Sequence, residues 1–258
     1  MPDPPSFTTK RRSIASDGTL SWGDSETSWR DSVAQSDRVS FDTGNPRPFG
    51  DVPDDGSIES FERDTLQYYS GALDQYSIST NWSHTGTRSL KTTANTPSPI
   101  WSFPSDGLGY YPQRGDTLRY VNVFRNMNAD GWQALRFTHV FAALDKDNYY
   151  SCTACLNAGG TTGGEPRFRI RKVKNGETVL SDTFKPPNVS EGVEMHIEIE
   201  FADTLTATAW TGDWGNNEWA SVAIEDYEFN TGGIAWDTSK GASQTSADFH
   251  IDDLHLVQ

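Results

Sequence analysis

The sequence predicts an all-β fold, a sandwich or a barrel, preceded by an extended N-terminal arm. From residue 57 to the end, short segments of alternating or apolar character follow one another at regular spacing. Glycine, asparagine, aspartate and proline separate these segments, and no stretch has the apolar spacing of an amphipathic helix. Many short strands between turn residues are typical of β-sandwiches and β-barrels.

The strand pattern is clearest in residues 194–201, where Met195, Ile197, Ile199 and Phe201 alternate with polar residues and therefore share one face. Asn175-Gly176 predicts a tight hairpin turn. In chain order, the strands that we expect are 118–124, 133–144, 149–156, 167–173, 178–184, 194–201, 205–210, 219–224, 233–236 and 249–257.

Residues 1–56 differ from the rest, because they are rich in serine, aspartate, proline and glycine and their apolar residues are isolated. We interpret them as an arm and linker, with short strands near 19–22 and 38–41, and residues 57–258 as the sandwich. Trp22 and Trp29 favour an arm that docks on a neighbouring subunit, since tryptophan is unusual in chains that stay solvated. The first residues lack the pattern of a secretory signal, so we expect a removed signal or release inside a virus particle.

The chain carries 36 acidic and 21 basic residues, a net charge of −15. An acidic surface that uses arginine more than lysine is typical of halophilic proteins, whose carboxylates hold water where the Debye length is about 3 Å or less. An ordinary acidic mesophilic protein is the alternative. Basic residues cluster only at 10–12 and 167–174, so we expect no nucleic-acid partner. No apolar run approaches the ~20 residues of a membrane helix, and we expect no membrane insertion.

Cysteine and histidine spacing indicates no redox or metal centre. Cys152 and Cys155 lie on a predicted strand and point to opposite faces, so we expect two buried thiols. We assign no ligand role to the histidines that lack metal-ligand spacing, which are His84, His139, His250 and His255.

Several segments together resemble one family. Residues 58–71 contain Phe61-Glu62 and Tyr69-Ser70-Gly71, and 85–90 follow with Gly86 and Ser89-Leu90. The later segments are 194–201, 205–209, 232–236 and 251–254. This order resembles the concanavalin A-like, LamG-like domains of haloarchaea and their viruses, over about residues 57–258. The resemblance implies a concanavalin A-like jelly-roll β-sandwich. Residues 19–22 and 27–33 resemble the leader of such domains in tail-fibre and adsorption proteins of haloarchaeal viruses.

The resemblance implies a non-enzymatic virion surface protein of a haloarchaeal virus, a capsid decoration, turret or tail fibre. Its lectin-like domain would attach to host glycans, and its arm would hold a homo-oligomer and other virion proteins together. Two alternatives stay open. One is a secreted carbohydrate-binding module or glycoside hydrolase, and the other is a purely structural capsid or tail component.

A hydrolase would need paired carboxylates. Glu194, His196, Glu198 and Glu200 share one strand face. Laminarinase-type hydrolases of the resembling fold carry Glu-x-Asp-x-Glu on such a strand, with carboxylates as nucleophile and acid/base. The central aspartate is absent here, so we expect a solvated strand face and no enzyme.

Sugar rings stack on exposed aromatic side chains, and several aromatic residues lie in predicted loops rich in glycine, aspartate and asparagine. We expect Trp236 in the core and the loop 212–219 to be the best candidate sugar-binding loop. The candidates are Trp214, Trp219, Trp132, Trp101 and Tyr111, together with Tyr110.

The resemblance also implies a structural Ca²⁺ that joins the first strand to the last. Glu62 lies in the first of these and Asp252-Asp253 in the last. Carboxylates from distant segments suit Ca²⁺, which takes 6–8 oxygen ligands. Such an ion would affect stability rather than reactivity, and an ordinary acidic surface is the alternative.

Overall fold

The computed structural model describes residues 10–14, 20–24, 55–93, 98–125, 135–156, 166–239 and 248–257. The chain divides into two units, Met1–Arg47 and Pro48–Gln258. In the first, β1 (Lys10–Ile14) and β2 (Leu20–Asp24) form an antiparallel pair. β2 overlaps the strand predicted near 19–22, and β1 was not predicted. The strand expected at 38–41 and Trp29 lie outside the described residues.

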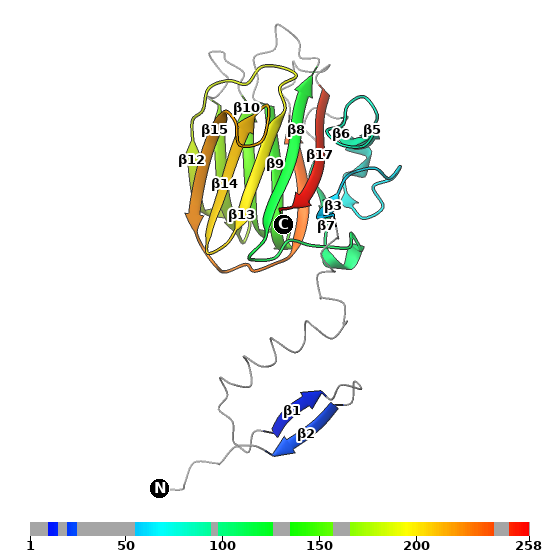
Figure 1. The fold of residues 1–258 in the computed structure, drawn as a ribbon, viewed down its shortest axis with the longest axis vertical. Helices are drawn as coiled ribbons and strands as arrows, with labels where there is room; N and C mark the ends of the chain where they lie inside the picture. The colour runs from blue at the N-terminus through cyan, green and yellow to red at the C-terminus, as the bar shows by residue number, and fades with distance from the viewer. Residues whose placement is uncertain are drawn as a thin grey trace. The chain divides into compact units, whose positions relative to one another are not determined.

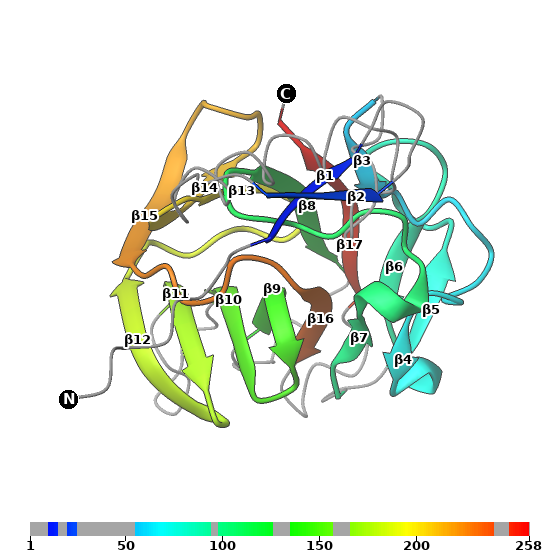
Figure 2. The ribbon, with the colours of Figure 1, turned by 90° about the horizontal axis from the view of Figure 1, so that it is seen from below.

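Two antiparallel sheets form the second unit, and Figures 1 and 2 show them as facing layers. This confirms the predicted sandwich. The seven-stranded sheet has the order β12 (Glu177–Phe184), β11 (Arg167–Lys174), β10 (Asn148–Leu156), β9 (Leu135–Asp145), β16 (Gly233–Ser239), β7 (Ile100–Ser102) and β4 (Ser70–Gly71).

The other sheet has eight strands. Its order is β15 (Glu218–Glu225), β14 (Thr204–Thr211), β13 (Met195–Phe201), β8 (Thr117–Arg125), β17 (Asp248–Leu256), β6 (Ser89–Thr92) and β5 (Tyr76–Ser79), and β3 (Ser57–Glu59) pairs with β17. Two short 3-10 turns, η1 (Leu73–Gln75) and η2 (Pro104–Asp106), complete the described elements. Within the described ranges, no helix is long and apolar enough to cross a membrane.

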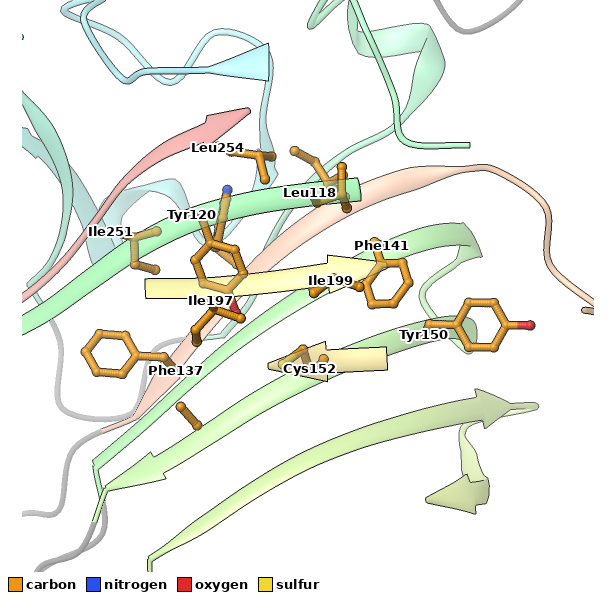
Figure 3. Close-up of a cluster of buried hydrophobic side chains, with 14 of the residues drawn as sticks. Leu118, Tyr120, Phe137, Phe141, Tyr150, Cys152, Ile197, Ile199, Ile251 and Leu254 are labelled. Atoms are coloured by element: carbon orange, nitrogen blue, oxygen red, sulfur yellow. The ribbon is translucent and has the colours of Figure 1, made fainter. Parts of the chain in front are cut away.

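The core lies between the two sheets because every second side chain of each central strand points inward. Figure 3 shows inward side chains of β8, β13 and β17 together with those of β9 and β10. Trp236 is fully buried, as predicted, and its ring contacts Phe61, Tyr120 and His139. β13 buries Met195, Ile197, Ile199 and Phe201, which confirms the face assigned from alternation.

The predicted hairpin turn joins β11 to β12. Asn175 and Gly176 both have positive φ, 54° and 77°, as the tight two-residue turn requires. The turn sets the register in which β12 pairs with β11. β11 carries a row of arginines on the outer face of the sheet.

Candidate functional site

Antiparallel pairing lines up outward side chains across the seven-stranded sheet, because directly opposed residues point to the same side. Three rows cross β11, β10, β9 and β16, and we call their residues the arginine face. The rows are Arg167–Cys155–Arg136–Ser239, Arg169–Thr153–Thr138–Asp237 and Arg171–Ser151–Val140–Ala235.

Four guanidinium groups and one carboxylate share the arginine face. Arg136 Nη2 donates to Asp237 Oδ2 at 2.8 Å. The Nε atoms of Arg136, Arg169 and Arg171 are buried and have no hydrogen-bond partner among the described residues. Since a buried donor without a partner costs free energy, these three side chains are held at a cost in the free protein.

The electrostatics agree with the geometry. Burial, followed by repulsion from neighbouring guanidinium groups, lowers the pKa of Arg169 and Arg171. Burial raises the pKa of Asp237, although Arg136 and Arg171 act in the opposite direction. The face therefore concentrates positive charge that the protein compensates only in part, in a chain of net charge −15.

A cavity of about 220 Å³ opens on this face. It is smaller than the ~300–1,000 Å³ pockets that enclose drug-sized ligands, so it suits one small polar group or one sugar unit of a longer chain. Cys155 contributes to its wall, whereas Cys152 is buried in the core. Their different positions confirm the opposite orientation predicted for the two side chains. Both thiols are free, as expected, but Cys155 is half-buried, so the expectation of two buried thiols is wrong for Cys155. The lining residues are Arg136, Thr153, Cys155, Arg167, Arg169 and Ser239.

An aromatic cluster borders the arginine face. Trp101 on β7 pairs with Ala235 of the third row. Its ring stacks on Phe103, with centroids 5.7 Å apart, and meets the edge of Tyr149 at the same distance. These neighbours bury Trp101, so the expectation of an exposed loop residue is wrong for Trp101. Tyr149 and Phe103 are the half-buried rings that remain partly accessible.

Other aromatic candidates are also buried. Trp219 lies in β15 and not in a loop, packs on Phe168, and donates from Nε1 to the Pro187 carbonyl. Tyr111 is buried and its hydroxyl contacts the Ser102 hydroxyl at 2.8 Å. Tyr110 is buried too. The expected exposure of these residues is therefore wrong, since each ring fills the edge of the core. Trp132 lies outside the described residues.

Trp214 is half-buried on the outer face of the eight-stranded sheet, away from the arginine face. The Arg119 guanidinium lies over its ring at 4.7 Å. Trp214 also meets the rings of His196 and Trp210 edge-on. Arg119 in turn donates to Glu198 Oε2 at 2.6 Å, so one of the carboxylates weighed for hydrolysis is held in an ion pair.

The residues expected to bind Ca²⁺ hold the segment that connects β5 to β6. Both carboxylate oxygens of Glu62 accept hydrogen bonds from Thr87, and Oε1 also accepts one from the Arg88 backbone. Asp252 is buried, and its Oδ2 accepts from the backbone of His84 and Thr85.

Burial raises the pKa of Asp252 to about 7 despite these bonds. Asp253 follows Asp252 in β17, and its Oδ1 accepts a hydrogen bond from the Thr85 hydroxyl. Hydrogen bonds from the segment between β5 and β6 thus engage the oxygens of Glu62 and Asp252. A structural Ca²⁺ at these residues stays a prediction.

Part of the arginine face was visible in the sequence. Arg167, Arg169 and Arg171 alternate along a predicted strand, which puts them on one face. Sequence reasoning noted this basic run but assigned it no ligand. Arg136 and Asp237 could not be added, because only the pairing of β9 with β10 and β16 brings them beside β11.

The two stacked antiparallel sheets form a β-sandwich, and its fold resembles the jelly roll of concanavalin A-like lectins and glucanases. No protein-family model matches the sequence, and no curated protein matches it. Among solved structures, the chain is similar to a glycoside hydrolase family 16 endo-glucanase from Bacteroides ovatus. The TM-score is 0.50 at 11% identity, over 77% of this chain and 98% of that one.

A second similar structure is the glycoside hydrolase family 43 protein BlXynB from Bacillus licheniformis. The TM-score is 0.50 at 10% identity, over 95% of this chain and 46% of that one, so this chain spans less than half of that protein. A legume lectin-like domain from Entamoeba histolytica has a TM-score of 0.46 at 11% identity, over 72% of this chain and 91% of that one. At such identities the likeness concerns the fold alone.

Proposed function

We propose that this protein binds carbohydrate without turning it over, and that its arginine face recognises glycans with carboxylate or sulfate groups. The observation that carries the proposal is the set of four guanidinium groups on one sheet face, three of which line the cavity, in an otherwise acidic chain. A planar guanidinium donates paired hydrogen bonds to such anions. The hydroxyls of Thr153 and Ser239 line the same cavity and can bond to sugar hydroxyls.

Direct contact matters more than long-range attraction in this proposal. At about 1 M salt the Debye length is about 3 Å, so charges act only across contact distances. The guanidinium groups of Arg136, Arg167 and Arg169, which line the cavity, would donate hydrogen bonds to a bound anion. Such charge-assisted bonds remain effective in the concentrated salt that the acidic composition suggests.

The proposal of binding without catalysis is supported by the position of the carboxylates. Glycoside hydrolysis usually needs two carboxyl groups that flank the scissile bond. Among the described residues, the wall of the cavity on the arginine face includes no carboxylate. On the opposite sheet, Glu198 is paired with Arg119 and Glu194 contacts His84.

The proposed test measures binding of polygalacturonate and dextran sulfate, with neutral dextran for comparison, in low and in high KCl. The variant Arg167→Gln/Arg169→Gln should bind the acidic polymers at least tenfold more weakly, because each charge-assisted bond contributes about 1.5–3 kcal/mol. The matched control Arg63→Gln/Arg125→Gln removes the same charge from exposed positions elsewhere and should bind like the unaltered protein.

Several results would contradict the proposal. Equal binding of neutral dextran would remove the role of the anion. If Trp214→Ala lost binding and the arginine variant did not, the binding site would lie on the opposite sheet. Tighter binding of a single-stranded oligonucleotide than of either polysaccharide would indicate a nucleic-acid site. Release of reducing sugar would indicate an enzyme.

The location on a haloarchaeal virion and the attachment to a host glycan belong to the same proposal. Their support is the acidic, arginine-preferring composition and the sequence resemblance of residues 19–33 and 57–258. In this proposal the arm holds a homo-oligomer and other virion proteins. Removal of residues 1–47 should abolish co-sedimentation with virus particles and leave glycan binding unchanged. A full-length chain that fails to sediment with particles would contradict this part.

A further inference from the structure

The outer face of the eight-stranded sheet carries a cluster of two histidines and a glutamate. His196 lies on β13, between Trp210 of β14 and Val121 of β8, and Asp252 of β17 follows Val121 in the same row. Asp252 holds the backbone of His84 over this row through a 2.8 Å hydrogen bond. His84 therefore lies above His196, although 112 positions separate them in the sequence.

The ligand atoms of the cluster converge. His84 Nδ1 lies 3.0 Å from Glu194 Oε2, and His196 Nε2 lies 3.6 Å from the same oxygen. All three groups offer ligand atoms within 4.8 Å of one another. In a tetrahedral Zn²⁺ site with metal–ligand bonds of about 2.0–2.1 Å, two ligand atoms are about 3.3 Å apart. The observed separations of 3.0 Å and 3.6 Å lie on either side of this value.

The surroundings hold each ligand in place. Trp82 Nε1 donates to the second oxygen of Glu194 at 3.3 Å, which leaves the first oxygen toward the histidines. The imidazole rings of His84 and His196 cross at 81° with centroids 5.1 Å apart. Trp214 covers the other side of His196 at 4.6 Å. Outer partners that orient ligating side chains are a regular feature of metal sites.

We propose that His84, Glu194 and His196 bind one transition-metal ion, Zn²⁺ or an ion of similar preference. This reverses the expectation, drawn from sequence spacing, that His84 has no ligand role. Two imidazoles and a carboxylate suit Zn²⁺, Ni²⁺ or Cu²⁺ and not Ca²⁺, which prefers oxygen ligands alone. The ion ties the segment between β5 and β6 to the start of β13. Three protein ligands leave a fourth coordination position open. This site is independent of the arginine face, which belongs to the other sheet.

The test titrates Zn²⁺ into the full-length, untagged protein by calorimetry. One ion should bind per chain, and His84→Gln and Glu194→Gln should each weaken binding at least tenfold. The matched control is His255→Gln, because His255 also contacts a carboxylate, Asp253 at 3.5 Å, and is as exposed as His84, 25% against 26%. This control should bind Zn²⁺ like the unaltered protein, and excess Ca²⁺ should not compete.

A second measurement needs no substitution. Co²⁺ added to the unaltered protein should give the intense visible absorption of a four-coordinate ion, and Zn²⁺ should remove it. A spectrum that stays that of hydrated Co²⁺ overturns the proposal. A thiolate charge-transfer band also overturns it, because it would place the ion at Cys155. Unchanged Zn²⁺ affinity in folded His84→Gln and Glu194→Gln proteins has the same consequence.

Discussion

At the scale of single residues, the arginine face is a place where binding and stability oppose each other. Arg169 keeps a charged, partly buried guanidinium whose Nε has no partner among the described residues, and burial lowers its pKa. Natural binding sites often retain such unfavourable groups because a ligand satisfies them. The cost in the free protein is measurable.

We predict that Arg169→Met raises the free energy of unfolding by about 0.5–1 kcal/mol, the range typical when a strained functional group is replaced. The apolar side chain removes a desolvated charge and its repulsion from Arg167 and Arg136. Urea unfolding without ligand measures the change, and Arg125→Met is the exposed control. A lower free energy of unfolding in Arg169→Met would mean that Arg169 stabilises the folded sheet.

His139 is a second residue whose burial has a measurable result. It lies in the core beside Trp236 and Tyr120, and burial lowers its pKa from 6.5 to about 3. Between these values the unfolded chain binds a proton that the folded chain does not bind. This histidine therefore stabilises the fold fully above pH 6.5, and its contribution is lost as the pH falls.

We expect His139→Phe to reduce the fall of unfolding free energy between about pH 6 and pH 4, by up to about 1.4 kcal/mol per pH unit. Chemical unfolding at several pH values, for both proteins, isolates the contribution of this residue. His250, whose pKa burial lowers to about 4, should keep part of the pH dependence in the variant. Parallel curves for the two proteins would show that His139 is accessible to protons when folded.

At the scale of elements, the β11–β12 hairpin positions the arginines of β11. Its turn uses two left-handed residues, Asn175 and Gly176, and Asn175 is also held by the Asn148 side chain at 3.1 Å. Among the described strands, β12 is an edge strand that pairs with β11 alone. The hairpin therefore depends on its turn more than the central strands depend on theirs.

We predict that Gly176→Ala lowers the free energy of unfolding by about 1 kcal/mol, because alanine resists positive φ. An added Cβ would meet only Asp147 Oδ1, at an ordinary 3.5 Å, so backbone strain alone is responsible. Gly176→Asn should lose less, since asparagine tolerates this conformation. Thermal unfolding of the three proteins measures the difference. Equal stability of the alanine variant would rule out a left-handed turn.

At the scale of the whole molecule, charge is distributed unevenly. The chain has a net charge of −15, while the arginine face sets four basic groups against Asp237. The remaining surface repels itself at low salt, and screening removes this repulsion. Stability and glycan binding should therefore respond to salt in different ways.

We expect the melting temperature to rise as KCl increases from about 0.1 M to about 1 M, since the Debye length falls from ~10 Å to ~3 Å. Each 1 kcal/mol of relieved repulsion corresponds to about 2–4 °C for a protein of this size. Differential scanning calorimetry in KCl measures it, with sorbitol at equal osmolality as the uncharged comparison. A flat or falling melting temperature would contradict the halophilic interpretation of the composition.

The alternation of polar and apolar residues determined by itself where most long strands run, which side of β13 faces the core, where the β11–β12 turn lies and how Cys152 and Cys155 diverge. These features depend on neighbours in the chain, and the period of two is local. The same period already placed three arginines of β11 on one face.

Only the tertiary structure decided which strands pair, and therefore which distant side chains meet. Pairing of β9 with β16 and β10 joined Arg136 to the arginine face, and the connection before β6 brought His84 to Glu194 and His196. The tertiary structure also buried Trp101, Trp219 and Tyr111, which the composition around them had suggested to be exposed loop residues. Contacts between segments about a hundred residues apart depend on sheet order, and no local pattern encodes sheet order.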